Sequence, residues 1–228
     1  MHALRIGRLG KAVLLTTVMM ALVTVLFAAA TPVANADESV QPKTSALGKS
    51  LGQWFELWSI WNSPYGGGPD HHGNYRHMPL PVPDCTEPKH KRDPWYCVGE
   101  LDVSLMHDQG FFLPVNGYVG WEYLDGSEDP LLDDSVFVDV DVSVTLDGES
   151  FFDSEELDLT DFYSEQYYNQ PLYVDPDAAG YRADIFVQGV TFLCPALSPG
   201  THVLHLYEDA PAWNVIWDNT WNITVTAE

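Results

Sequence analysis

The strongest constraint on the fold is a stretch of strict alternation between residues 135 and 146. Every second position is aliphatic, and most positions between them are polar or acidic. The aliphatic members are Val136, Val138, Val140, Val142, Val144 and Leu146. Because successive side chains of a β-strand point to opposite faces, this period of two predicts one continuous strand with one buried face.

Six further segments carry weaker strand signals and are separated by turn residues. They are residues 95–105, 110–115, 118–123, 181–193, 201–207 and 220–226. Many short strands and a single convincing helix predict a mainly β protein, an antiparallel β-sandwich of the immunoglobulin-like or jelly-roll-like kind. Residues 154–179 are acidic and rich in tyrosine without a clear period, so we expect them to form an excursion from one edge of the sandwich.

One short helix is expected before the strands. Ser50 and Gln53 have the spacing of a capping box, and the sequence Asn62-Ser63-Pro64 ends the helical pattern. Three tryptophans lie along one face at positions i, i+4 and i+7: Trp54, Trp58 and Trp61. A stripe of this kind predicts packing against a sheet rather than stacking on a ligand.

The first 36 residues predict a signal peptide. Three basic residues precede an apolar stretch at residues 12–30, and the small residues around Asn35 indicate cleavage between Ala36 and Asp37. An uncleaved membrane anchor is the alternative, because the apolar stretch is just long enough to span a bilayer. After cleavage we expect a secreted or periplasmic protein without a stable membrane span.

The part that remains is expected to consist of a flexible segment, residues 37–49, and a single domain, residues 50–228. The whole chain has 10 basic and 33 acidic residues, which gives a formal net charge of −23. This excess of carboxylates repels phosphate backbones and anionic lipid headgroups, so we expect no nucleic-acid partner. An extracellular or cell-envelope ligand, such as a glycan or a cation, fits the charge better.

The chain contains three cysteines: Cys85, Cys97 and Cys194. In an oxidising compartment one disulfide and one free thiol are expected. We favour the local pair Cys85–Cys97, and Cys97–Cys194 is the alternative.

The sharpest cluster of metal-ligand residue types lies in a loop rich in Gly, Pro and His, residues 65–94. Asp70, His71, His72 and His77 together offer a carboxylate and three imidazoles, which are ligands that zinc accepts. Their spacing matches no established metal motif, and solvent-exposed histidines are the alternative interpretation. Acidic residues just before the predicted 135–146 strand are candidate calcium ligands: Asp125, Glu128, Asp129, Asp133 and Asp134. We assign no cofactor on this basis, and calcium and zinc remain the candidates.

Two aromatic residues outside the predicted strands are candidates for ligand contact. Trp213 follows Pro211 in a loop, and Tyr65 begins the Gly/Pro/His-rich loop. Trp217 and Trp221 share a strand face with aliphatic residues and are therefore expected in the core. His202 and His205 lie three apart in a predicted strand, so they should point to opposite faces and serve the structure.

Several segments follow a shared pattern. They are the helix tryptophans, Asp70-x-x-Gly73, and residues 111–116, 197–205 and 218–225. In these segments the chain resembles a family of uncharacterised secreted bacterial proteins with an N-terminal Trp-rich helix and a β-sandwich. The resemblance implies architecture and export, and the family has no established activity to carry over.

No nucleophile elbow, zinc-protease motif, phosphate-binding loop or dinucleotide fingerprint occurs in the chain. We therefore expect a secreted or envelope-associated, non-catalytic binding module that uses residues 65–94 and the neighbouring loops. The alternative is a metal-dependent extracellular hydrolase that uses Asp70, His71, His72 and His77. A hydrolase with paired carboxylates also stays open, because many acids are present.

Overall fold

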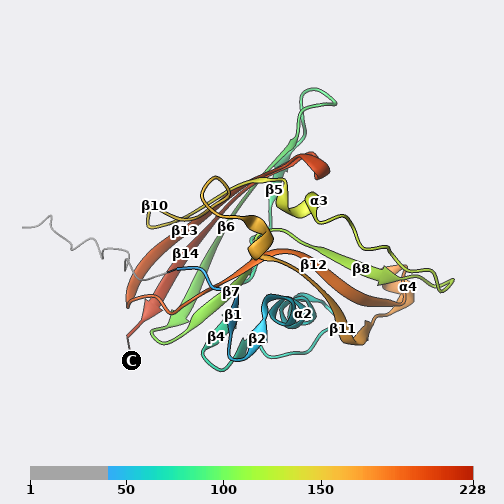
Figure 1. The fold of residues 1–228 in the computed structure, drawn as a ribbon, viewed down its shortest axis with the longest axis horizontal. Helices are drawn as coiled ribbons and strands as arrows, with labels where there is room; N and C mark the ends of the chain where they lie inside the picture. Colours follow the sequence, from blue (N-terminus) through green and yellow to red (C-terminus); the bar gives the residue numbers. More distant parts are fainter. Residues whose placement is uncertain (1–40, 228) are drawn as a thin grey trace, which may run out of the picture. The chain divides into compact units, whose positions relative to one another are not determined.

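Two packed sheets make up most of the computed structural model, which describes residues 41–227 (Figure 1). The first sheet has the strand order β10-β9-β13-β14-β6-β5. Its strands are β5 (Asp84–Thr86), β6 (Trp95–Met106), β9 (Asp141–Leu146), β10 (Glu149–Asp153), β13 (Gly200–Ala210) and β14 (Val215–Thr226).

The second sheet has the order β11-β12-β7-β4-β3, and β8 also pairs with β12. Its strands are β3 (His71–His72), β4 (Tyr75–His77), β7 (Gly110–Pro114), β8 (Tyr118–Glu122), β11 (Tyr163–Tyr173) and β12 (Ala183–Cys194). Phe192 of β12 stacks on Phe152 of β10 with ring centroids 5.3 Å apart, so the two sheets meet in one aromatic core.

The mainly β architecture is confirmed, and each of the six weaker strand predictions overlaps an observed strand. Most ladders are antiparallel. Two are parallel, β14 with β6 and β4 with β7. The β6–β14 ladder runs from Val215 opposite Trp95 to Thr226 opposite Met106. This pairing joins segments far apart in the chain, which local periodicity cannot predict.

The strand predicted from residue 135 is wrong over its first part. Residues Ser135–Val138 form the single-turn helix α3, and the strand β9 begins only at Asp141. The Asp133 carboxylate accepts hydrogen bonds from the backbone N–H of Ser135 at 3.0 Å and from its hydroxyl at 2.5 Å. This local turn competes with extended backbone, and it places Phe137 in the core.

The prediction that residues 154–179 form an excursion from the sandwich edge is wrong for much of this segment. The strand β11 pairs with β12, and the 3-10 helix η1 (Leu159–Asp161) and the short helix α4 (Pro176–Ala179) flank it. The ladder shifts register between Tyr167 and Leu172. Such an irregularity interrupts the alternation of inward and outward residues, which explains why the sequence showed no period of two.

The predicted N-terminal helix is confirmed as α2 (Leu51–Asn62), and it packs against β11 and β12. Ser50 and Gln53 form the expected capping box. Trp54 and Trp58 are buried, and Trp61 is half-buried. The helix covers one face of β12, whose twelve residues are all buried as a result of being covered on both sides.

Replacing Ser50 with alanine should lower the free energy of unfolding by about 1 kcal/mol, because the Gln53 backbone N–H loses its hydroxyl acceptor. Urea denaturation followed by circular dichroism measures the change. Ser150→Ala, at an exposed position of β10, is the matched control and should leave the midpoint within experimental error. Equal effects of the two substitutions would show that the cap does not stabilise α2.

The predicted signal peptide, its cleavage site at Ala36 and Asp37, and residues 38–40 lie outside the described residues. Residues 41–49 belonged to the segment expected to be flexible. They contain the strand β1 (Ser45–Ala46), which pairs with β2 (Lys49–Ser50) across a turn with positive φ at Leu47 and Gly48. Lys43 also exchanges two backbone hydrogen bonds with Leu193.

The predicted disulfide between Cys85 and Cys97 is confirmed. The two residues lie directly opposite each other on β5 and β6, so the bond fastens the short edge strand β5 to the first sheet. Cys194 is a buried free thiol on β12, and burial raises its pKa well above the usual value. A buried thiol with a raised pKa is a poor nucleophile.

Candidate functional site

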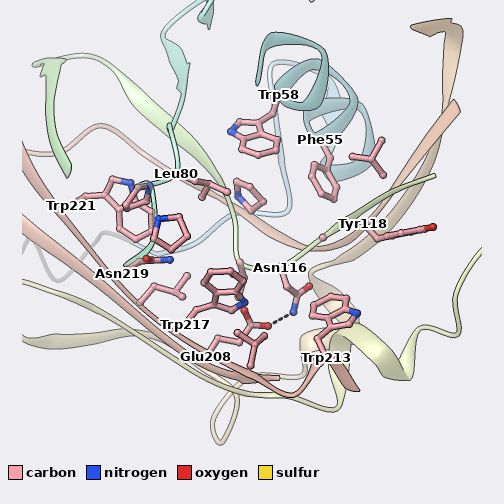
Figure 2. Close-up of a pocket in the computed structure, with 18 residues that line it drawn as sticks. Phe55, Trp58, Leu80, Asn116, Tyr118, Glu208, Trp213, Trp217, Asn219 and Trp221 are labelled. Carbon is pink, nitrogen blue, oxygen red and sulfur yellow. Dashed lines mark hydrogen bonds between the residues drawn. The ribbon is translucent and has the colours of Figure 1, made fainter. Parts of the chain in front are cut away.

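A cavity of about 470 Å³ lies beside the inner face of β13 and β14 (Figure 2). The helix α2 and the β7–β8 junction line it from other directions, as does the 3-10 helix η2 (Pro211–Trp213). The walls are mainly apolar and contain six large aromatic side chains: Phe55, Trp58, Tyr118, Trp213, Trp217 and Trp221. Volume and lining are typical of small-molecule sites in proteins.

Residues 78–83, which we call the strap, run along one side of the cavity and contribute Leu80, Pro81 and Pro83 to its lining. Two tryptophan indoles hold the beginning of the strap. Trp58 donates its indole N–H to the carbonyl of Met78 at 2.8 Å, and Trp221 donates to the carbonyl of Pro79 at 2.7 Å. Since both N–H groups are occupied, these tryptophans contribute apolar surface to the cavity.

Glu208 of β13 is a carboxylic acid within this apolar surface. It is fully buried, and its Oε1 accepts a hydrogen bond of 2.8 Å from the side-chain amide of Asn116 (Figure 2). That amide also donates to the carbonyl of Phe137 at 3.1 Å, and its oxygen accepts from the backbone N–H of Val190 at 2.9 Å. The backbone donor at Val190 therefore fixes which way the amide points. Glu208 Oε2 has no hydrogen-bond partner in the described structure.

Burial raises the pKa of Glu208 to about 7. The hydrogen bond from Asn116 acts in the opposite direction, and the negative charge of the neighbouring Asp209 raises the pKa further. A carboxyl group in such a site changes between its neutral and ionised forms close to neutral pH. Strongly shifted pKa values of this kind cluster at functional sites.

A second unpartnered oxygen belongs to another residue of the cavity lining. Asn219 of β14 lines the cavity, and its side-chain oxygen is buried without a hydrogen-bond partner in the described structure. A Cβ atom at Gly99 would lie 2.6 Å from this oxygen, so the glycine leaves room for the amide. Asn219 pairs with Leu206, which makes it a diagonal neighbour of Glu208 on the same sheet face.

Of the two predicted ligand-contact residues, the structure places only one in the cavity lining. Trp213 lies in the cavity wall, with its ring centroid 5.5 Å from that of Phe137. Tyr65 is 37% exposed and lies outside the cavity lining. Trp221 is in the core as expected, whereas Trp217 is only half-buried and faces the cavity opposite Glu208.

The candidate metal residues do not gather around one point. His71 pairs with the Asp70 carboxylate at 2.8 Å, and the Arg76 guanidinium lies 3.7 Å from the same carboxylate. His72 and His77 lie together, with ring centroids 5.3 Å apart. Within residues 41–227, no group of three or more His, Cys, Asp or Glu side chains could hold a metal ion. The zinc hypothesis has no geometric support there.

His77 is a buried imidazole in an aromatic environment. Its ring lies within 6.4 Å, centroid to centroid, of Trp54, Trp61 and Phe112, and neither ring nitrogen has a hydrogen-bond partner in the described structure. Burial lowers the pKa of His77 to about 4, and the neighbouring His72 lowers it as well. The imidazole is therefore neutral at physiological pH.

The strand histidines point to opposite faces, as predicted. His202 is buried and hydrogen-bonded to Asp147 at 2.7 Å and to the carbonyl of Ser198 at 2.9 Å, so it fastens two loops together. His205 lies on the outer face, 2.7 Å from Asp218.

Three of the five candidate calcium ligands, Asp125, Asp129 and Asp133, accept hydrogen bonds from the protein itself. Asp129 accepts hydrogen bonds from the hydroxyls of Tyr118 and Tyr123 and from the backbone N–H of Trp121. Asp125 accepts from Ser127 in the same way that Asp133 accepts from Ser135. These bonds fasten the three carboxylates to neighbouring residues of the chain.

The sequence did not reveal the importance of Glu208 and Asn116, which line the cavity and bond to each other. Glu208 continues the inward alternation of His202, Leu204 and Leu206, so an acid at an inward position was the available signal. The predicted strand ended at Tyr207, one residue too early to reveal it. Asn116 carried no comparable signal, because its role depends on β12 and β13.

Comparisons with known proteins add no constraint on the site: no protein-family model, curated protein or solved structure matches this chain. Among the helices of residues 41–227, none has the length and apolar character needed to cross a membrane.

Proposed function

We propose that this chain is an exported, non-catalytic binding module whose binding site is the cavity beside β13 and β14. A small, largely apolar ligand would occupy the cavity, and its polar group would meet Glu208. The observation that carries the proposal is the unpartnered Oε2 of a fully buried carboxyl group in an aromatic cavity of about 470 Å³.

The unpartnered oxygen supports a ligand because buried polar atoms in proteins are nearly always hydrogen-bonded. Leaving such an atom without a partner destabilises a fold by about 1–3 kcal/mol. A ligand that supplies the missing donor would remove this penalty and bury the aromatic walls at the same time.

Binding fits this lining better than hydrolysis does. Among the described residues that line the cavity, Glu208 is the one acid, and no histidine, serine, cysteine or lysine accompanies it. Glycoside hydrolysis by paired carboxylates would need a second acid at a defined separation.

Export is supported by two features that are independent of the cavity. The N-terminal sequence has the charge, apolar stretch and small residues of a signal peptide. The Cys85–Cys97 disulfide is typical of proteins that fold in an oxidising compartment.

Replacing Leu80 with tryptophan should block the cavity, because Leu80 lies on the strap and is 42% exposed at the cavity wall. We expect the affinity for N-phenyl-1-naphthylamine, an uncharged aromatic fluorophore, to fall by roughly tenfold or more, which corresponds to about 1.4 kcal/mol. The emission of the bound fluorophore reports binding, and the four cavity tryptophans provide a second signal through quenching.

Leu124→Trp is the matched control, since Leu124 is 55% exposed and lies outside the cavity. This variant should bind the fluorophore like the wild type. Thermal unfolding of both variants verifies that they are folded. Absence of binding to the wild type, or equal binding to both variants, would refute the proposed site.

A further inference from the structure

The few polar groups of the mainly apolar cavity indicate which class of ligand it would bind. Its two unpartnered side-chain oxygens, Glu208 Oε2 and Asn219 Oδ1, are hydrogen-bond acceptors. Among the described residues that line the cavity there is no lysine, arginine or histidine, so no protein cation neutralises the carboxylate. The indole N–H groups of Trp58 and Trp221 are already occupied by the strap. The described lining therefore offers two free acceptor oxygens and no positively charged side chain, which a cationic ligand would complement.

We infer that the ligand of this cavity is a small organic cation, an apolar molecule that carries a primary or secondary ammonium group. This inference rests on the proposed binding function and names the chemical class that the site selects. The ammonium N–H groups would donate to Glu208 Oε2, with Asn219 Oδ1 as a second acceptor in the same cavity. Hydrogen bonds between ionised partners are about twice as strong as those between neutral ones.

The aromatic walls support the same class of ligand. Four tryptophans and Phe55 line the cavity, and Trp217 lies directly opposite Glu208 in the β13–β14 ladder (Figure 2). Tryptophan is the best partner for a cation, because the face of its ring carries negative electrostatic potential. A carboxylate among aromatic rings combines both modes of cation recognition at one place.

The charge of the whole chain acts in the same direction. With 33 acidic and 10 basic residues, the protein creates a negative potential that attracts cations and repels anions. A carboxylate-bearing apolar ligand, such as a fatty acid, would meet Glu208 as a like charge and is disfavoured.

The ionisation of Glu208 couples ligand binding to pH. An ammonium ligand favours the carboxylate form, so its affinity should rise between about pH 6 and about pH 8 while an aliphatic amine stays protonated. The charged group that acts on Glu208 is Asp209, which is adjacent in β13 and raises the pKa of Glu208. Tyr118 is the other titratable side chain in the lining, and burial raises its pKa to about 12, so it stays neutral.

The test compares three ligands by isothermal titration or by displacement of the fluorophore. They are 2-phenylethylamine, the uncharged propylbenzene of nearly equal shape, and the bulkier quaternary trimethylammonium analogue of 2-phenylethylamine. We expect the primary ammonium to bind roughly tenfold or more tightly than propylbenzene, with the quaternary ion between them because it lacks N–H donors. The substitution Glu208→Gln should weaken binding of 2-phenylethylamine by roughly tenfold and leave propylbenzene within about twofold.

Glu149→Gln, at an exposed position of β10, removes one negative charge outside the cavity and serves as the control for overall charge. It should bind all three ligands like the wild type. Equal affinity for 2-phenylethylamine and propylbenzene, or an ammonium affinity unaffected by Glu208→Gln, would overturn the cation inference while leaving the cavity as a binding site. Failure of the fluorophore to bind would instead reject the proposed function itself.

Discussion

Replacing Glu208 with glutamine should stabilise the ligand-free protein at alkaline pH by about 3 kcal/mol relative to its effect near pH 4.5. The pKa of Glu208 is raised from 4.5 to about 7 in the folded state, mainly by burial. Between these values the unfolded chain ionises while the folded protein stays protonated, so wild-type stability falls as the pH rises. Glutamine does not ionise and keeps an oxygen that can accept from Asn116.

Urea denaturation of the wild type and of Glu208→Gln at several pH values measures this difference. A packing change caused by the amide would alter the free energy of unfolding by the same amount at every pH. Only the part of the difference that varies with pH therefore reports the ionisation of Glu208. Glu149→Gln, which changes an exposed acid of β10, should show a difference that is nearly constant with pH. A constant difference for Glu208→Gln as well would mean that Glu208 is not a buried acid with a raised pKa.

The destabilising effect of ionised Glu208 supports a functional role for this residue. A core position that alternation reserves for an apolar side chain carries a carboxyl group instead, with one hydrogen bond and an apolar environment. Stability sacrificed at one position is typical of functional sites. Ligand binding would restore it, since a ligand that binds only the folded state stabilises the protein by mass action.

The part of the fold that local patterns determine was predictable. The capping box at Ser50 and the tryptophan stripe predicted α2, and period-two alternation identified residues 142–146. Weaker strand signals between turn residues located six further strands: β6, β7, β8, β12, β13 and β14. The failures arose where short-range hydrogen bonds or irregular ladders overrode the pattern. Asp133 turns the chain at Ser135 into a helix, and the register shift in β11 conceals that strand.

The cavity could not be predicted for a different reason. Its walls come from α2, the strap, the β7–β8 junction, β13 and β14, and the parallel pairing of β6 with β14 sets how the first sheet is arranged. The sequence offered a cluster of histidines near residue 70 as the most conspicuous chemistry. The acid in the cavity wall is a single residue whose significance appears only when its neighbours in space are known.

Replacing His77 with leucine should stabilise the protein in acid. The gain in the free energy of unfolding of the variant over the wild type should be about 3 kcal/mol larger at pH 4 than at pH 7.5. Burial lowers the pKa of His77 from 6.5 to about 4 in the folded state. As the pH falls through this interval, His77 binds a proton in the unfolded chain but not in the folded protein. The free energy of unfolding of the wild type therefore falls. Leucine has a similar volume and no titratable group, and it removes two unpartnered ring nitrogens from the core.

The stabilisation by Glu208→Gln should grow as the pH rises, and that by His77→Leu should grow as the pH falls. Each variant therefore serves as a control for the other. Below about pH 4.5 the Glu208 variant gains little, and above about pH 6.5 the His77 variant gains no pH-dependent stability. His107→Leu, at an exposed turn, controls for the loss of an ordinary histidine. If His77→Leu and His107→Leu changed the urea midpoint equally at every pH, the imidazole of His77 would have to be accessible to protons in the folded protein.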